Sequence, residues 1–287
     1  GYKKVFEASK KYAIMLDRRS FGPSLFESSV TNSKEEFEED GCNVTQNFIE
    51  YNGQKLYTEN RTDGTSTKQK RLLTTDEELE FYCSLPVNTD PEVIEKEMDA
   101  HYDKYMKERE EFPEEYGSMM LAIGEPIGPL YGASDLYQFP IWSITHIDVI
   151  VDLLDRLMER QRLIYEYCLK RNMAEVYFLV GSELAAPPMV SRDTFKKWIV
   201  PYGKKIVDMV RGYGQKSIMH FHGQIKEILP DFAEMAPDGL HTIEAPPVGN
   251  CTFTEAFEET ENKIALIGNI QYDCFRSYTP DQMREAV

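Results

Sequence analysis

The segment Ser217-Ile218-Met219-His220-Phe221-His222-Gly223 decides the fold of this chain. It is a short apolar strand that ends in two histidines and a glycine, and a predicted helix over residues 224–236 follows at once. Because the side chains of a strand alternate between its two faces, His220 and His222 are predicted to point the same way from its carboxyl end. Two imidazoles on one face can share a metal ion or hold a substrate anion.

The same pattern, an apolar strand followed by a helix, occurs four more times. The other predicted strands cover residues 119–123, 175–180, 239–243 and 263–267. Buried strands that alternate with helices predict a parallel sheet. No glycine-rich nucleotide-binding sequence follows any of them, which removes the usual reason for an open sheet. We therefore expect an α/β fold, a TIM (β/α)8 barrel, that is incomplete at both ends of this 287-residue chain.

An antiparallel β-meander is predicted before this region. Three β-like segments cover residues 43–51, 54–61 and 65–73, and the Asn52-Gly53 and Asp63-Gly64 pairs between them favour tight hairpin turns. An amphipathic segment over residues 6–16 precedes them, and a long polar helix capped by Asp90 follows to about residue 109. We interpret residues 43–73 as an insertion into a single barrel domain that spans residues 1–287.

Composition excludes several classes of partner. The formal net charge is −17, and the acidic run at residues 35–40 has no basic counterpart, so nucleic acid is excluded as a partner on electrostatic grounds. No apolar run reaches the length of a membrane span, and no signal peptide is visible. The 5 cysteines are dispersed, as is typical of reduced thiols. The sequence predicts a cytoplasmic protein and leaves its oligomeric state open.

A polar side chain stands at the end of every predicted strand. These residues are Glu125, Glu183, the pair His220 and His222, Glu244 and Asn269. A barrel gathers the carboxyl ends of its strands around one mouth, where active sites of this fold are built. We therefore expect these side chains to lie close together.

The histidine pair and two glutamates are the candidates for metal binding or catalysis. Two histidines and one carboxylate, with a fourth position open, form a known catalytic zinc pattern, so we predict a zinc site at His220, His222 and Glu244. Glu183 and Glu244 are the candidate catalytic carboxylates, as ligands or as a general base. The alternative is a pair of hydrogen-bonded histidines at a pocket wall beside solvated glutamates.

Three further residues are candidates for substrate binding. Asn269 can hydrogen-bond a ligand, Tyr131 can give the mouth an aromatic side, and Arg192 can clamp a substrate carboxylate. Each also has a structural alternative, as a turn cap, a core aromatic or a surface cation. His241 stands on the strand of Glu244 at odd spacing, and we expect it to face outward.

The C-terminal part of the chain resembles the uroporphyrinogen decarboxylase superfamily. The resemblance lies in His220-Phe221-His222-Gly223, in Ile228-Leu229-Pro230-Asp231, in Asp238-Gly239-Leu240 with Ile243-Glu244, and in the run from Ala265 to Ile270. It extends over roughly residues 115–287, and it implies a TIM barrel.

The resemblance implies two activities. Its corrinoid-dependent methyltransferases carry His-x-Cys at this strand end and a later cysteine, all binding zinc; here His220 matches the histidine and His222 replaces the first cysteine. This branch implies a zinc-dependent methyltransferase or demethylase that acts between a small methyl donor or thiol and a corrinoid, which a partner protein can carry. The alternatives are a cofactor-free tetrapyrrole decarboxylase of porphyrin biosynthesis, whose arginine-rich N-terminal motif is not seen here, and a non-catalytic corrinoid- or porphyrin-binding protein.

Overall fold

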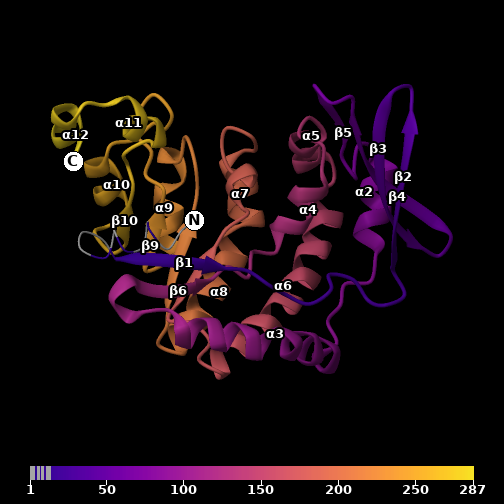
Figure 1. The fold of residues 1–287 in the computed structure, drawn as a ribbon, viewed down its shortest axis with the longest axis horizontal. Coiled ribbons are helices and arrows are strands. Elements are labelled where there is room, and N and C mark those ends of the chain that lie inside the picture. The colour runs from indigo at the N-terminus through magenta and orange to yellow at the C-terminus, as the bar shows by residue number, and fades with distance from the viewer. Residues whose placement is uncertain (1–3, 5–6, 8–9, 11–13) are drawn as a thin grey trace. The chain divides into compact units, whose positions relative to one another are not determined.

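The computed structural model describes residues 4, 7, 10 and 14–287, and Figure 1 shows its elements. Residue contacts divide the chain into two compact units, a finer division than the single domain expected from the sequence. The first unit comprises Gly1–Gly22, Met98–Glu125 and Ile164–Val287, and the second comprises Pro23–Glu97 and Pro126–Leu163. Two boundaries fall within α3 (Pro91–Glu111) and α6 (Ile147–Lys170), and the other two follow Gly22 and Glu125.

A six-stranded sheet forms the centre of the first unit. Its order is β1-β6-β7-β8-β9-β10, and all neighbouring strands run parallel, which confirms the predicted parallel sheet. The strands are β1 (Met15–Arg19), β6 (Gly117–Leu121), β7 (Val176–Leu179), β8 (Lys216–His220), β9 (Gly239–His241) and β10 (Ala265–Ile267). Within the described residues β1 and β10 are not paired, so the sheet is part of a TIM barrel and not the closed eight-stranded barrel.

Strand β1 is the one member of this sheet that the sequence did not reveal. It pairs with β6 from Met15 opposite Gly117 to Arg19 opposite Leu121. Its side chains alternate between half-buried and exposed, but Asp17 and Arg19 occupy half-buried positions, so the hydrophobic pattern of a strand is lost. The amphipathic segment expected over residues 6–16 lies largely outside the described residues.

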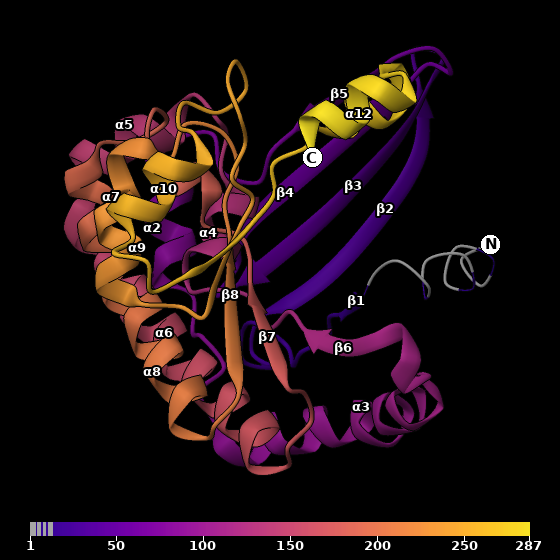
Figure 2. The ribbon, with the colours of Figure 1, turned by 90° about the vertical axis from the view of Figure 1, so that its left-hand side faces the viewer.

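Helices of the first unit follow its strands. They are α7 (Arg192–Trp198), α8 (Val200–Gly212), α9 (Leu229–Met235), α10 (Phe253–Glu259), α11 (Tyr272–Ser277) and α12 (Pro280–Ala286), with short 3-10 turns at Glu114–Tyr116, Glu183–Ala185 and Lys226–Ile228. Side chains cap two of these helices: Ser191 accepts from the Thr194 amide at the start of α7, and Thr279 forms a capping box with Gln282 at the start of α12. In Figure 2, α8, α9 and α10 lie along the same side of β8. Across the described chain, no helix combines the length and apolarity that a membrane crossing needs.

Three buried aromatic rings anchor the end of β8. Phe221 lies 5.9 Å from Phe195 and 4.8 Å from Phe232 between ring centroids, and all three side chains are fully buried. Phe221 therefore points into the helical layer formed by α7 and α9. Because its neighbours in sequence point the opposite way, this packing turns His220 and His222 away from that layer.

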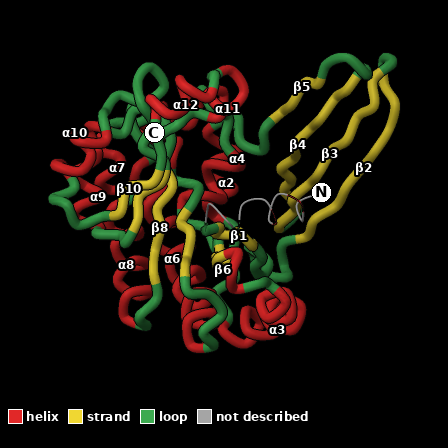
Figure 3. Tube along the Cα trace, turned by 60° about the vertical axis from the view of Figure 1, so that its left-hand side comes forward, coloured by secondary structure: helices red, strands yellow, loops and turns green. Residues whose placement is uncertain are grey.

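The second unit contains an antiparallel sheet of four strands, drawn in yellow at the right of Figure 3. They are β2 (Thr31–Glu39), β3 (Cys42–Tyr51), β4 (Gln54–Thr62) and β5 (Thr67–Lys70), accompanied by α2 (Asp76–Ser84), α4 (Ile127–Ala133) and α5 (Gln138–Thr145). The predicted meander and its Asn52-Gly53 turn are confirmed, with both turn residues at positive φ. Strand β2 was missed, because all nine of its residues are exposed and no apolar alternation marks it.

Candidate functional site

His220 and His222 occupy the carboxyl end of β8, as the sequence predicted. Their ring centroids lie 4.4 Å apart with the rings nearly perpendicular. The His220 side chain retains 13% of its accessible surface, whereas that of His222 retains 55%. His220 is therefore largely enclosed by the protein, whereas His222 is exposed to solvent.

His241 joins this pair, contrary to the expectation that it faces outward. It ends β9, and the parallel register places its Cα opposite that of His220. The two Nδ1 atoms are 2.7 Å apart, and the rings stack with centroids 4.8 Å apart. The outward prediction was wrong because it extended strand alternation to Glu244, three residues beyond the end of β9. Two consecutive strands that both end in histidine were the available signal.

The two predicted carboxylates contact different members of the histidine cluster, by which we mean His220, His222 and His241. A Glu183 oxygen is 3.5 Å from His220 Nε2, and the other accepts from the Gly181 amide at 3.0 Å. A Glu244 oxygen is 3.3 Å from His222 Nδ1, and the other accepts from the Gly223 amide at 2.5 Å. Both glutamates are therefore held in place by backbone amides.

The electrostatic environment favours the neutral forms of His220 and His241 and the charged form of Glu244. Burial lowers the pKa of His220 to about 4, and the neighbouring His222, His241 and Arg18 act in the same direction. Burial, followed by His222, also lowers the pKa of His241. For Glu244, burial raises the pKa, but hydrogen bonds from Gly223, Gln271 and His222 outweigh it and leave the pKa below its usual value.

These contacts assign the tautomers of the neutral rings. The Glu183 carboxylate favours a proton on the facing Nε2 of His220, so His220 Nδ1 accepts the hydrogen bond and His241 Nδ1 donates it. His241 is then left with a lone pair on Nε2. Glu183 thus orients His220, and His220 in turn orients His241, whose Nε2 can act as a base.

Aromatic and cationic groups complete this part of the site. The Phe178 ring of β7 lies 5.3 Å from the His220 ring and 5.9 Å from the His241 ring between centroids. The Arg18 guanidinium of β1 lies 5.9 Å from the centre of the same Phe178 ring. Arg18 received no role from the sequence, because β1 itself was not recognised.

The three predicted substrate-binding residues belong to different elements of the chain. Asn269 follows the end of β10, and its neighbour Gln271 reaches Glu244. Arg192 forms a bidentate pair with the buried Asp231 at 2.8 and 3.0 Å, so its guanidinium joins α7 to α9. Tyr131 belongs to the second unit, where its ring lies 6.3 Å from that of Phe139.

Glu125 is a buried acid that sequence analysis noted only as a strand-end residue. It follows β6, is 2% exposed, and its Oε2 has no hydrogen-bond partner among the described residues. Burial raises its pKa from 4.5 to about 7; the Ser182 hydroxyl opposes this shift and the Glu183 charge adds to it. A carboxyl group with such a pKa can give or take a proton at neutral pH.

The raised pKa predicts a stability difference between the protein and its Glu125→Gln variant. Between pH 4.5 and about 7 the folded protein binds more protons than the unfolded chain, so its stability falls as pH rises through that window. Glutamine cannot titrate, so the variant escapes this loss. We expect the variant to gain roughly 3 kcal/mol over the wild type between pH 4.5 and pH 8, measured by urea unfolding at both values. A difference independent of pH would contradict the assignment.

The donor set was tested for a metal site. Within the part of the chain that the structure describes, no group of three or more His, Cys, Asp or Glu side chains is placed to hold a metal ion. Both nitrogens of His220 and both oxygens of Glu244 already face protein partners. His220, His222 and Glu244 offer suitable donor atoms, but this arrangement does not fit a shared ion. Zinc ligation stays a prediction.

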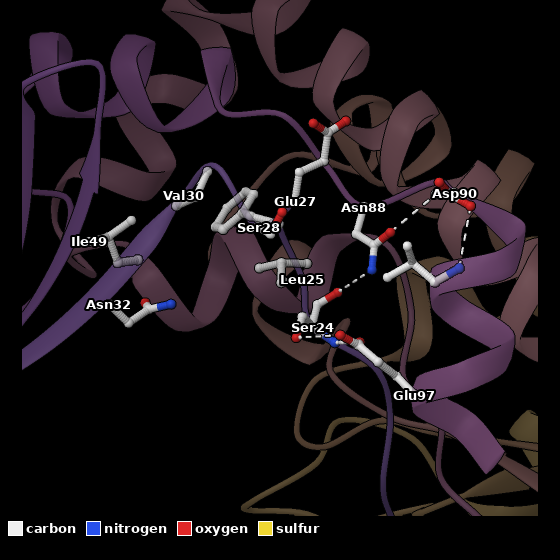
Figure 4. Close-up of a pocket in the computed structure, with 12 residues that line it drawn as sticks. Ser24, Leu25, Glu27, Ser28, Val30, Asn32, Ile49, Asn88, Asp90 and Glu97 are labelled. Atoms are coloured by element: carbon white, nitrogen blue, oxygen red, sulfur yellow. Dashed lines mark hydrogen bonds between the residues drawn. The ribbon is translucent and has the colours of Figure 1, made fainter. Parts of the chain in front are cut away.

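The second unit contains a pocket of about 650 Å³, shown in Figure 4. Its carboxylates are already bonded: Glu97 accepts from the amide and hydroxyl of Ser24, and Asp90 caps α3 through the Glu92 and Val93 amides. None of the residues that line it belongs to the histidine cluster. These bonds give Asp90 and Glu97 structural roles.

A parallel α/β sheet with polar side chains at its carboxyl ends defines the class of barrel-type enzymes that act at the strand mouth. Residues 114–287 match the family model "Uroporphyrinogen decarboxylase (URO-D)". Because this match covers more than half of the chain, the protein belongs to the URO-D family.

A search of solved structures gives a similar fold. A methyltransferase from Methanosarcina mazei is 16% identical, with a TM-score of 0.50 over 73% of this chain and 58% of that one. This likeness shows the fold, and the present chain spans 58% of the length of that protein. No curated protein matches the sequence.

Proposed function

We propose that this URO-D family member is a methyltransferase that moves a methyl group between a small methylated donor and a thiol or corrinoid acceptor. The observation that carries the proposal is the hydrogen-bonded pair of neutral imidazoles, His220 and His241. Glu183 contacts the His220 end of the pair, and Nε2 of His241 carries a lone pair at the other end. Neutral imidazoles supply a base, and methyl transfer to a thiol requires one. The fold shared with the Methanosarcina mazei methyltransferase is consistent with this activity.

The residues suggest the following chemistry with a thiol acceptor. The thiol gives its proton to Nε2 of His241, whose Nδ1–H bond to His220 fixes the orientation of the ring. The thiolate then attacks the methyl carbon, a sulfur–carbon bond forms, and the electron pair of the broken bond stays with the leaving atom of the donor. Glu244 follows β9 and Asn269 follows β10, and both are proposed to contact the substrate or donor.

The proposal also includes a zinc ion and a corrinoid. Zinc at His220, His222 and Glu244 would act as a Lewis acid toward a thiol when bound. Ligation would require Glu244 to give up its contact with His222 or with the Gly223 amide. Support for this part comes from the resemblance of the His220–Gly223 segment to the zinc-binding segment of the methyltransferase branch.

Two measurements test the proposal. Purified protein mixed with methylcobalamin and a simple thiol should demethylate the corrinoid, followed by its absorbance, and boiled protein should not. Elemental analysis should find about one zinc per chain, lost in His222→Ala. Methyl transfer by a metal-free protein would overturn the zinc assignment alone. Absence of transfer to any thiol or from any corrinoid would overturn the function.

Tetrapyrrole decarboxylation is the second candidate, and Arg18 favours it. This exposed cation lies beside Phe178 and close enough to His220 to lower its pKa, so it can meet a substrate carboxylate at the mouth. Uroporphyrinogen offered to the protein should then release carbon dioxide. Arg18→Gln should weaken substrate binding in that assay and leave methyl transfer unchanged.

A further inference from the structure

Strand β2 forms an open edge of the antiparallel sheet (Figure 3). It pairs with β3 over its whole length, from Thr31 opposite Glu50 to Glu39 opposite Cys42, and within the described residues no strand pairs with its other side. All nine of its residues are exposed, so no described loop or helix covers that side. An edge strand presents unpaired backbone N–H and C=O groups, which can hydrogen-bond one more extended segment.

The side chains of β2 determine the charge of a segment that can pair with it. The strand contains four glutamates and one lysine. Glu36 and Glu39 already form ion pairs, whereas Glu35 and Glu38 form no hydrogen bond or ion pair within the described chain. A second copy of β2 would bring four more glutamates to this edge, and like charges on neighbouring strands are destabilising. A basic segment would instead neutralise the carboxylates that β2 leaves unpaired.

The pocket of the second unit lies beside the beginning of this strand. Asn32 of β2 and its cross-strand neighbour Ile49 of β3 both line the pocket, so it lies on the face of the sheet to which these two side chains point (Figure 4). Cross-strand neighbours share a face, so a residue opposite Asn32 on an added strand points to the pocket side. The pocket offers apolar groups of Leu25 and Val93 and the exposed carboxylate of Glu27, which suit the apolar stem and cationic end of lysine or arginine.

We propose that the outer edge of β2 binds an extended, basic segment of a partner protein, which adds a fifth strand to the four-stranded sheet. Backbone hydrogen bonds hold the segment along β2. Its lysine or arginine side chains meet Glu35 and Glu38, and one of them enters the pocket beside Asn32. All of these groups belong to the second unit, and docking there does not require methyl transfer.

A labelled peptide of alternating lysine and valine, nine residues long to match β2, is the probe for this edge. Its fluorescence anisotropy should rise when the protein is added, and salt should weaken the binding. Two control peptides should not bind: one has glutamate in place of lysine, and the other keeps the lysines but has every backbone amide N-methylated. If the lysine peptide does not bind, the proposal is wrong. Equal binding of the N-methylated peptide would mean that charge alone attracts the probe, which would overturn the added strand.

Hydrogen exchange locates the bound peptide. The backbone amides of β2 should exchange more slowly with the lysine peptide present. Those of β5, at the other edge of the sheet, should not change, because β5 carries two lysines and no carboxylate. Slower exchange at β5, or none at β2, would contradict the proposal. If β2 is protected in the protein alone and sedimentation shows a dimer, the edge binds a second copy and the basic partner is wrong.

Charge reversal tests the two unpaired carboxylates. The double variant Glu35→Lys/Glu38→Lys should bind the lysine peptide about 10-fold more weakly and should gain affinity for the glutamate peptide. The control Glu258→Lys/Glu259→Lys makes the same change in net charge at exposed positions of α10, and its affinities should stay within about 2-fold of the wild type. Glu27→Gln should weaken the lysine peptide about 3-fold. Equal weakening in the two double variants would show attraction to net charge alone and would refute a site at β2.

Discussion

Replacing His220 by alanine is expected to slow methyl transfer by about 100-fold or more, the usual contribution of a positioned acid–base group. The variant loses the 2.7 Å contact with His241 and leaves Glu183 without its imidazole partner. His241 would then lose both its orientation and the tautomer that exposes Nε2. The loss should appear in kcat and kcat/KM together, because the interaction serves the transition state more than binding.

A matched control separates this effect from the loss of any histidine. His146, at the end of α5, contacts the hydroxyl of its own neighbour Thr145, and His146→Ala should keep full activity. Because His220 lies at a half-buried strand end, unfolding in urea should be measured for both variants. A His220→Ala protein that is folded and nearly as active as the wild type would show that the histidine cluster does not carry the reaction.

The second large effect is expected at Gly249, a buried residue in the loop that follows Glu244. A Cβ atom built there would lie 1.8 Å from the Glu244 carbonyl oxygen, and that oxygen belongs to the backbone. The chain must therefore move, because no side-chain rotation relieves the clash. Gly249→Ala should cost about 3 kcal/mol of the free energy of unfolding, as overpacking of a core does. It should also displace Glu244 from His222 and Gly223.

Gly212→Ala is the control for this substitution. Gly212 ends α8, and a Cβ there meets nothing within 4 Å, so alanine should be neutral or slightly stabilising through its higher helix propensity. Urea unfolding of both variants measures the difference. Equal stability of the two variants would mean that the 244–249 loop is free to rearrange, and that the position of Glu244 does not depend on Gly249.

Much of the local structure could be predicted because it depends on neighbours in sequence. The Asn52-Gly53 turn follows from the two residues that tolerate positive φ, and the caps at Ser191 and Thr279 follow from hydroxyls three residues before an amide. The apolar strand before His220 and the four similar strands, each followed by a helix, predicted the parallel sheet. Strands β1 and β2 escaped prediction because polar residues interrupt the first and make up most of the second.

The position of His241 was predicted wrongly and the incomplete barrel was predicted only in part, for related reasons. Strand–helix repetition indicates parallel pairing, but it does not set how many strands pair; the structure pairs six and leaves β1 and β10 apart among the described residues. Alternation assigns a face only while the strand continues, and β9 ends at His241. Counting from Glu244 therefore started beyond the regular strand.

The sequence by itself determined the family, the parallel sheet, and the presence of His220, His222, Glu183 and Glu244 at strand ends, because these follow from local order and motif. Only the tertiary structure decided which of these groups meet. The register between β8 and β9 brings His241 to His220, and burial at the end of β6 turns Glu125 into an acid with a pKa near neutrality. Register and burial depend on residues far apart in the chain, and no local pattern contains them.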